Sequence, residues 1–140
     1  MARFNDTNVP AAIQPHLQQG EKLKHWAFGV KQPNLGLIVL LIAMGILPGV
    51  IAVALLTKNY IVALTERRVL VLRFKGKLNV VDVMEYPLQP RPKGSGSSGA
   101  LFTHIRIDDA TKPFKAKFHR MGMPNNREQS QAILAAVASA

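Results

Sequence analysis

The sequence contains no cysteine, few acidic residues and few aromatic residues. Among its 140 residues there are only 8 Asp and Glu, and the aromatic fraction is 6%. The absence of cysteine excludes disulfides, thiolate nucleophiles and cysteine-based metal sites. The scarcity of aromatic side chains leaves few platforms on which the bases of a single-stranded nucleic acid could stack.

The sequence also lacks a recognisable catalytic or metal-binding pattern. Its four histidines are not at metal-ligand spacing: His16, His25, His104 and His119. The pair Asp108–Asp109 is typical of a turn between two strands. The stretch GSGSSG at 94–99 lacks the Lys-Ser/Thr pair and the following helix of a phosphate-binding loop. We therefore expect no enzymatic activity, no metal site and no cofactor.

Basic residues, by contrast, are abundant. The 18 Lys and Arg give a net charge of +10 at pH 7 with neutral histidines, which favours lipid headgroups, nucleic acid or an acidic protein as partner. Five of them are expected to contact anionic headgroups or a partner: Arg73, Lys75, Lys77, Lys115 and Lys117. The alternative is an ordinary solvated surface. Nucleic acid is not the expected partner, because the C-terminal helix carries only Arg127 and Trp26 lies far from the basic half.

The longest apolar run extends from Leu35 to Leu56 without a charged residue and is long enough for a transmembrane helix of about 20 residues. Pro48 and Gly49 are residue types that favour a turn, and lysines flank both ends of the run. We therefore expect a membrane-inserted hairpin with arms at 35–47 and 50–56, and a single transmembrane helix is the alternative. A soluble helical hairpin, buried in an oligomer or against a sheet, is a further alternative. The residues expected to insert are Leu37, Leu40, Leu41, Ile46, Pro48, Gly49, Ile51 and Leu55.

The remainder of the chain is predicted to be mainly β, with one C-terminal helix. Strands are expected over 20–30, in NYIVALT and RVLVLRF, and further along in LNVVDVMEY, ALFTHIRI and FKAKF. KGK at 75–77 is a predicted turn, and the Pro-, Gly- and Ser-rich stretch at 87–99 is a predicted flexible loop. The helix is expected over 126–138, capped by Asn125 or Asn126.

Two short motifs resemble those of bacterial pleckstrin-homology-like domains. Gly20-Glu21 precedes the first predicted strand, and Tyr60, Leu64, Thr65, Arg67 and Arg68 match a Y-x-x-x-LT-x-R-R stretch. The resemblance implies a small antiparallel barrel or sandwich, formed by 20–34 and 58–140 and plugged by the C-terminal helix. The membrane segment at 35–57 would be inserted into this domain, and residues 1–19 would be a polar N-terminal segment.

The function expected from these features is that of a non-enzymatic, membrane-anchored accessory or assembly subunit of a larger membrane complex, such as a respiratory, photosynthetic or transport assembly. The expected partners are the lipid bilayer and that complex, and a homo-oligomer is compatible with the sequence. The first twenty residues lack the apolar core of a cleavable signal peptide. The expected location is the inner membrane of a bacterium, with the β-domain on the cytoplasmic side. A stand-alone module that binds anionic lipids is the main alternative, and nucleic-acid binding is a second one.

Overall fold

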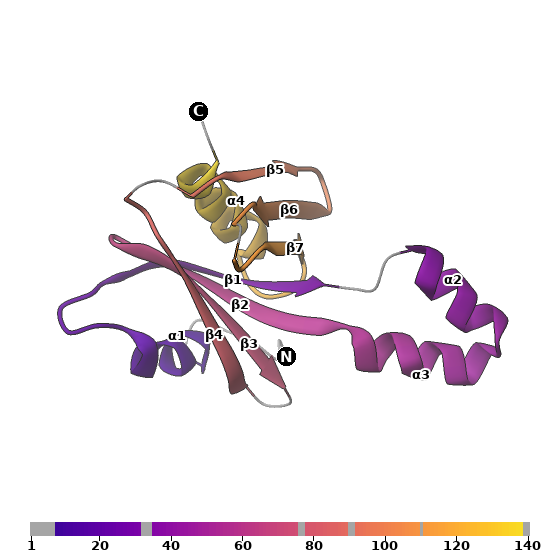
Figure 1. The fold of residues 1–140 in the computed structure, drawn as a ribbon. Coiled ribbons are helices and arrows are strands. Elements are labelled where there is room, and N and C mark those ends of the chain that lie inside the picture. Colours follow the sequence, from indigo (N-terminus) through magenta and orange to yellow (C-terminus); the bar gives the residue numbers. More distant parts are fainter. Residues whose placement is uncertain (1–7, 32–34, 76–77, 90–91, 110, 139–140) are drawn as a thin grey trace.

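The computed structural model describes residues 8–31, 35–75, 78–89, 92–109 and 111–138. The chain is mainly β, with a C-terminal helix (Figure 1). Its helices are α1 (Asn8–Ile13), the 3₁₀ turn η1 (Gln14–His16), α2 (Leu35–Ala43), α3 (Ile46–Leu56) and α4 (Asn126–Val137). Its strands are β1 (Leu23–Lys31), β2 (Lys58–Thr65), β3 (Arg68–Lys75), β4 (Asn79–Pro87), β5 (Gly94–Ser98), β6 (Phe102–Ile107) and β7 (Phe114–His119).

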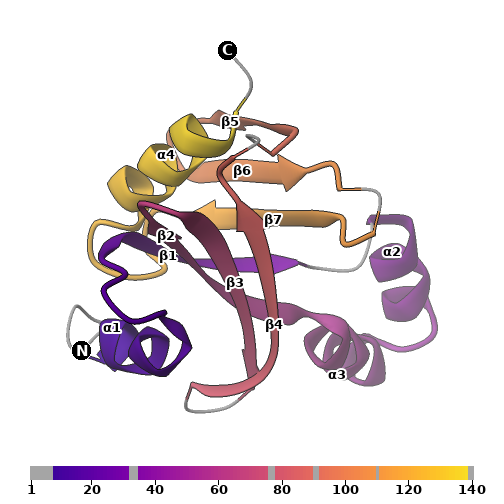
Figure 2. The same cartoon turned by 60° about the vertical axis from the view of Figure 1, so that its left-hand side comes forward.

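The seven strands form one antiparallel sheet in the order β4-β3-β2-β1-β7-β6-β5. Strands β1 to β4 form one half and β5 to β7 the other, and the two halves meet where β1 pairs with β7. That junction is narrow, because Val30 and Lys117 are its one paired position among the described residues. The sheet folds over at this junction, so that β5–β7 and α4 lie across one face of β1–β4 while α1 lies on the opposite face (Figures 1 and 2).

Strands β2 and β3 are buried on both faces, which explains why they are continuous apolar runs rather than alternating ones. Alternate residues face two different cores. Tyr60, Val62 and Leu64 face β6, β7 and α4 across the folded sheet. Ile61 and Ala63 face the second core, to which α1 contributes Val9 and Ile13.

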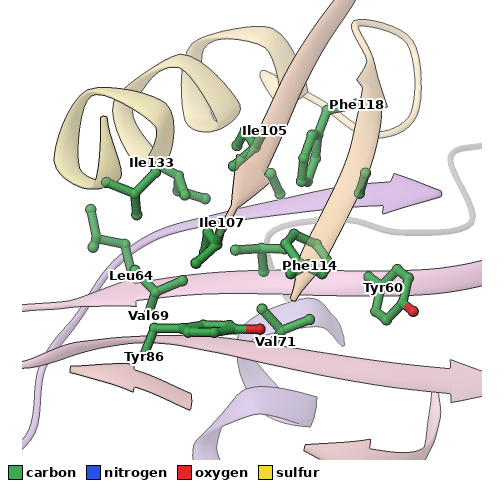
Figure 3. Packing of buried hydrophobic residues seen from close by; sticks show 14 residues of the cluster. Tyr60, Leu64, Val69, Val71, Tyr86, Ile105, Ile107, Phe114, Phe118 and Ile133 are labelled. Carbon is green, nitrogen blue, oxygen red and sulfur yellow. The ribbon is translucent and has the colours of Figure 1, made fainter. Parts of the chain in front are cut away.

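The core between the two halves is well filled. Figure 3 shows Ile105, Ile107, Phe114 and Phe118 directed toward the residues of β2 and β3, with Ile133 of α4 closing one end. The rings of Tyr60 and Phe114 meet edge to face at 5.2 Å, a favourable aromatic geometry. Burial raises the pKa of Tyr86 to about 12, and its hydroxyl donates a hydrogen bond to the Lys112 carbonyl.

The C-terminal helix is fixed to β1 by one buried amide. Asn126 Oδ1 accepts a hydrogen bond from the Phe28 backbone N–H at 2.8 Å, and its Nδ2 donates to the Phe28 and His119 carbonyls at 3.0 and 2.7 Å. The side chain thus takes the place of a neighbouring strand where β1 and β7 separate. Asn125 occupies the N-cap position, but its side chain makes no capping bond.

The predicted fold class was wrong in its membrane segment. No helix in the described part of the chain is long and apolar enough to span a membrane. The apolar run is divided into helices of nine and eleven residues, which at about 1.5 Å per residue are about half as long as a bilayer core is thick. Three predictions were therefore wrong: the membrane-inserted hairpin, the single transmembrane helix and the assignment as a membrane protein.

Two local predictions also differ from the structure. The chain reverses at Met44-Gly45 rather than at Pro48-Gly49, since Gly45 has a φ of 148° that favours glycine. Part of the predicted flexible loop at 87–99 forms strand β5, paired along its whole length with β6. Of the predicted turn at 75–77, Lys75 ends β3, and residues 76–77 lie outside the described residues.

Candidate interaction surface

The most unusual surface of the molecule is the pair of helices α2 and α3, which we call the apolar hairpin. It projects from the end of β1 and the start of β2, away from the rest of the fold (Figures 1 and 2). Gly49 lies where the helices touch, and a Cβ there would come within 2.3 Å of the Leu41 carbonyl oxygen. Pro48 is tolerated because it precedes the first intrahelical bond of α3, from Gly49 N–H to Gly45 O.

The hairpin helices pack on each other but leave most of their apolar side chains uncovered. Ten of the thirteen large apolar side chains that are exposed in the described residues belong to the segment 35–56. At the tip, Met44, Ile46 and Leu47 are 76, 77 and 72% exposed. A helix that is apolar all round is normally buried, and an exposed apolar patch of this kind is typical of an interaction site.

The residues that the sequence predicted to enter a membrane therefore lie in this hairpin instead. Leu37, Leu40, Ile46, Pro48 and Ile51 are exposed, whereas Leu41 is half-buried and Gly49 is buried between the helices. Leu55 is in α3, but its side chain lies outside the described set. The membrane-inserted hairpin that these residues were to form is the part of the prediction that was wrong.

Three lysines form a row across the sheet at the base of the hairpin. Lys31 at the end of β1 pairs directly with Lys58 at the start of β2. The register that pairs Asn59 with Phe74 places Lys75, at the end of β3, beside Lys58. Directly paired residues point to the same face of a sheet, and all three side chains are exposed. We call Lys31, Lys58 and Lys75 the lysine row.

The basic residues predicted to contact an anionic partner do not form one cluster. Arg73 faces Asp82 across β3 and β4, and Lys75 belongs to the lysine row. Lys115 and Lys117 lie on the outer face of β7, opposite Arg106 and His104, with Lys117 Nζ 5.1 Å from the Phe102 ring centre. Lys77 lies outside the described residues. That these residues contact an anionic partner remains a prediction.

Three residues of the two motifs, Glu21, Thr65 and Arg68, form a largely buried network at the opposite end of the sheet from the hairpin. The Glu21 carboxylate accepts hydrogen bonds from Arg68 at 2.9 and 3.1 Å, from Thr65 Oγ1 at 2.7 Å and from the Gln18 backbone N–H at 2.9 Å. Arg68 also pairs with Glu85 and donates to the His16 carbonyl. The bonds from Arg68 lower the pKa of Glu21 to about 2 against the opposing effect of burial. Every group in this network is satisfied within the chain, so its role is to join the N-terminal segment to β3.

Sequence reasoning did not group the lysine row, because its members are far apart along the chain. The only signal was that Lys31 and Lys58 flank the uncharged run. Among the described residues, no three His, Asp or Glu side chains are placed to hold a metal ion. The geometry therefore indicates a binding surface: uncharged helices bordered at their base by ammonium groups.

No family model matches the chain, and no curated protein or solved structure matches it. The resemblance to bacterial pleckstrin-homology-like domains therefore stays a prediction that rests on the two motifs.

Proposed function

We propose that this protein is a non-enzymatic accessory subunit that attaches to a larger protein assembly through its apolar hairpin. The observation that carries the proposal is the exposure of the hairpin tip, where Met44, Ile46 and Leu47 have no covering layer. The proposal keeps the accessory role predicted from the sequence and omits the membrane anchor.

The cost of leaving the hairpin uncovered supports this function. Burying one exposed Leu or Ile side chain contributes about 1.5–3 kcal/mol, so covering several of them is a strong driving force for association. The sheet body, which consists of the seven strands with α1, η1 and α4, has its own two cores, and none of the hairpin side chains that the structure describes belongs to either core. A helical segment whose described apolar side chains lie outside the cores of its own domain is suited to filling a groove in another protein.

The attachment of the hairpin also suits docking. It is held at both ends by adjacent strands, because β1 leads into α2 and α3 leads into β2, and these strands are paired over eight positions. The hairpin therefore leaves the sheet at a fixed place, which reduces the entropy lost on binding compared with a free tail.

The test compares two triple variants of equal chemistry in affinity capture from the source cells. The variant M44S/I46S/L47S replaces the apolar side chains of the hairpin tip by serine. The variant V81S/L101S/M121S does the same to three exposed apolar side chains elsewhere. We expect a stoichiometric protein partner that is retained by wild type and by the control, is lost from the tip variant, and re-forms the complex from purified components. A wild-type protein that stays a monomer with no tip-dependent partner would falsify the proposal, and so would a tip-dependent homodimer.

A further inference from the structure

The lysine row is an electrostatic irregularity in an otherwise well-paired sheet. Like charges that lie directly opposite each other on neighbouring strands destabilise the pairing, and here Lys31 faces Lys58 with Lys75 next in line. None of the three ammonium groups forms an ion pair within the described residues. The next position along β3 toward its start on this face is Arg73, which is paired across the strands with Asp82. The Asp82 carboxylate accepts a hydrogen bond from the Val83 backbone N–H.

A contrast within the sheet makes the row informative. At the other end of the same strands, Arg68 forms ion pairs with both Glu21 and Glu85. The Glu66 carboxylate there accepts a hydrogen bond from the Lys22 backbone N–H. Carboxylates are thus placed against cations at the end away from the hairpin and are missing from the row at the end that carries it. The uncompensated positive charge coincides with the base of the uncovered apolar surface.

We infer that the partner of the apolar hairpin is an acidic protein surface, in which an apolar recess is bordered by carboxylates that pair with Lys31, Lys58 and Lys75. This inference rests on the proposed function and specifies the chemistry of the partner. A second copy that packs its own hairpin against this one does not supply that border, because the segment 35–56 has no carboxylate. Charges at the rim of an interface add mainly to association rate and to discrimination between partners, so the row selects an acidic partner while the apolar side chains provide the binding energy.

The test uses two synthetic amphipathic helical peptides of equal length that share one leucine face. In one peptide glutamates flank that face, and in the other lysines do. We expect the full-length protein to bind the glutamate peptide at least ~10-fold more tightly at low salt, with a preference that shrinks when the ionic strength is raised. The variant K31Q/K58Q/K75Q should bring the ratio of the two dissociation constants close to one. The control K22Q/K24Q/R127Q, which removes the same charge from other exposed positions, should keep the preference.

The outcomes separate this inference from the function on which it rests. Binding of both peptides with equal affinity, or a preference that survives in K31Q/K58Q/K75Q, overturns the inference and leaves the docking role of the hairpin intact. Loss of all peptide binding in M44S/I46S/L47S with a retained preference in wild type supports both. If wild type binds neither peptide but binds vesicles of anionic phospholipid, and the lysine variant does not, the row recognises lipid phosphates and the protein-partner assignment is overturned.

Discussion

Ile61 in β2 and Ile46 in α3 are the same residue type in opposite surroundings, 1% and 77% exposed respectively. The difference comes from the layers around each segment. Strand β2 has a layer of structure on each face, whereas α3 lies beside α2 and projects away from the sheet body (Figure 1). Apolar sequence therefore does not by itself decide burial in this protein. The sheet body buries its apolar side chains in two cores, and the hairpin leaves most of its described apolar side chains exposed.

The largest expected effect is a direct test of that division. Phe118→Ala empties the centre of the core against Gly29 and should lower the free energy of unfolding by about 4 kcal/mol. Leu47→Ala at the hairpin tip should change it by less than about 0.5 kcal/mol. Urea denaturation of both variants measures the two values. Similar losses would show that the hairpin belongs to the cooperative core.

The ion-pair network should give the next largest effect, and one that depends on pH. The pKa of Glu21 is about 2 in the folded protein and ordinarily 4.5, so its contribution of about 3 kcal/mol is complete above pH 4.5 and is lost as the pH falls toward 2. Glu21→Gln should lower stability by about that amount at pH 7 and flatten the dependence in this window.

The exposed Glu66 provides the control for that experiment. Backbone N–H groups lower the pKa of Glu66 as well, but because its carboxylate is exposed, Glu66→Gln should remove only a small part of the pH dependence between pH 4.5 and 2. Thermal melts across this range measure both variants. An unchanged pH profile in Glu21→Gln would mean that the network does not hold the N-terminal segment to β3.

A smaller loss is expected at the amide that joins α4 to β1. Asn126→Ala removes the hydrogen bonds that the Asn126 side chain makes to the Phe28 N–H and C=O, which should cost about 2 kcal/mol. Arg127→Ala, on the exposed side of the same helical turn, is the matched control and should be nearly neutral. Hydrogen exchange of the Phe28 amide should accelerate in the first variant only, and equal exchange rates in both would contradict the assignment.

The smallest global effect should accompany a large local one. Gly49→Ala places a methyl group against the Leu41 carbonyl and should force α2 and α3 apart. Because the sheet body does not depend on this contact, the free energy of unfolding measured in urea should change by less than about 0.5 kcal/mol. Amide exchange across 46–56 should become faster. A drop in the midpoint comparable with that of Phe118→Ala would contradict the independence of the two regions.

The sequence predicted two kinds of element most accurately: the strands that are buried on both faces, and the C-terminal helix. NYIVALT and RVLVLRF give β2 and β3, and the helix expected over 126–138 is found at Asn126–Val137. Strand β5 was missed because GSGSS has almost no β propensity. It is a strand because Gly94 and Gly96 allow close approach of Val137 and Leu134 in α4, which larger residues would prevent.

The candidate surface was only partly readable for a different reason. The uncharged run and its flanking lysines are visible in the sequence, but the position of the break in that run depends on which glycine takes a positive φ. Gly45 does so, and Gly49 serves helix contact instead. The lysine row depends on strand register, which brings Lys31, Lys58 and Lys75 together from three separate segments and which no local pattern encodes.

The narrow junction between β1 and β7 also has a consequence for biosynthesis. Strands β1 to β4 pair with their neighbours in chain order, apart from the intervening hairpin, so this half can form while the rest of the chain is still being made. Among the described residues, Lys117 pairs with the far edge of β1 and Asn126 bonds to it. These two residues leave the ribosome about 2–8 s after Pro87 at ~5–20 residues per second. During that interval the nascent protein carries an open strand edge, the feature that most readily pairs with a neighbouring chain. We expect this exposure of the strand edge to end when α4 has been completed and packs against β1.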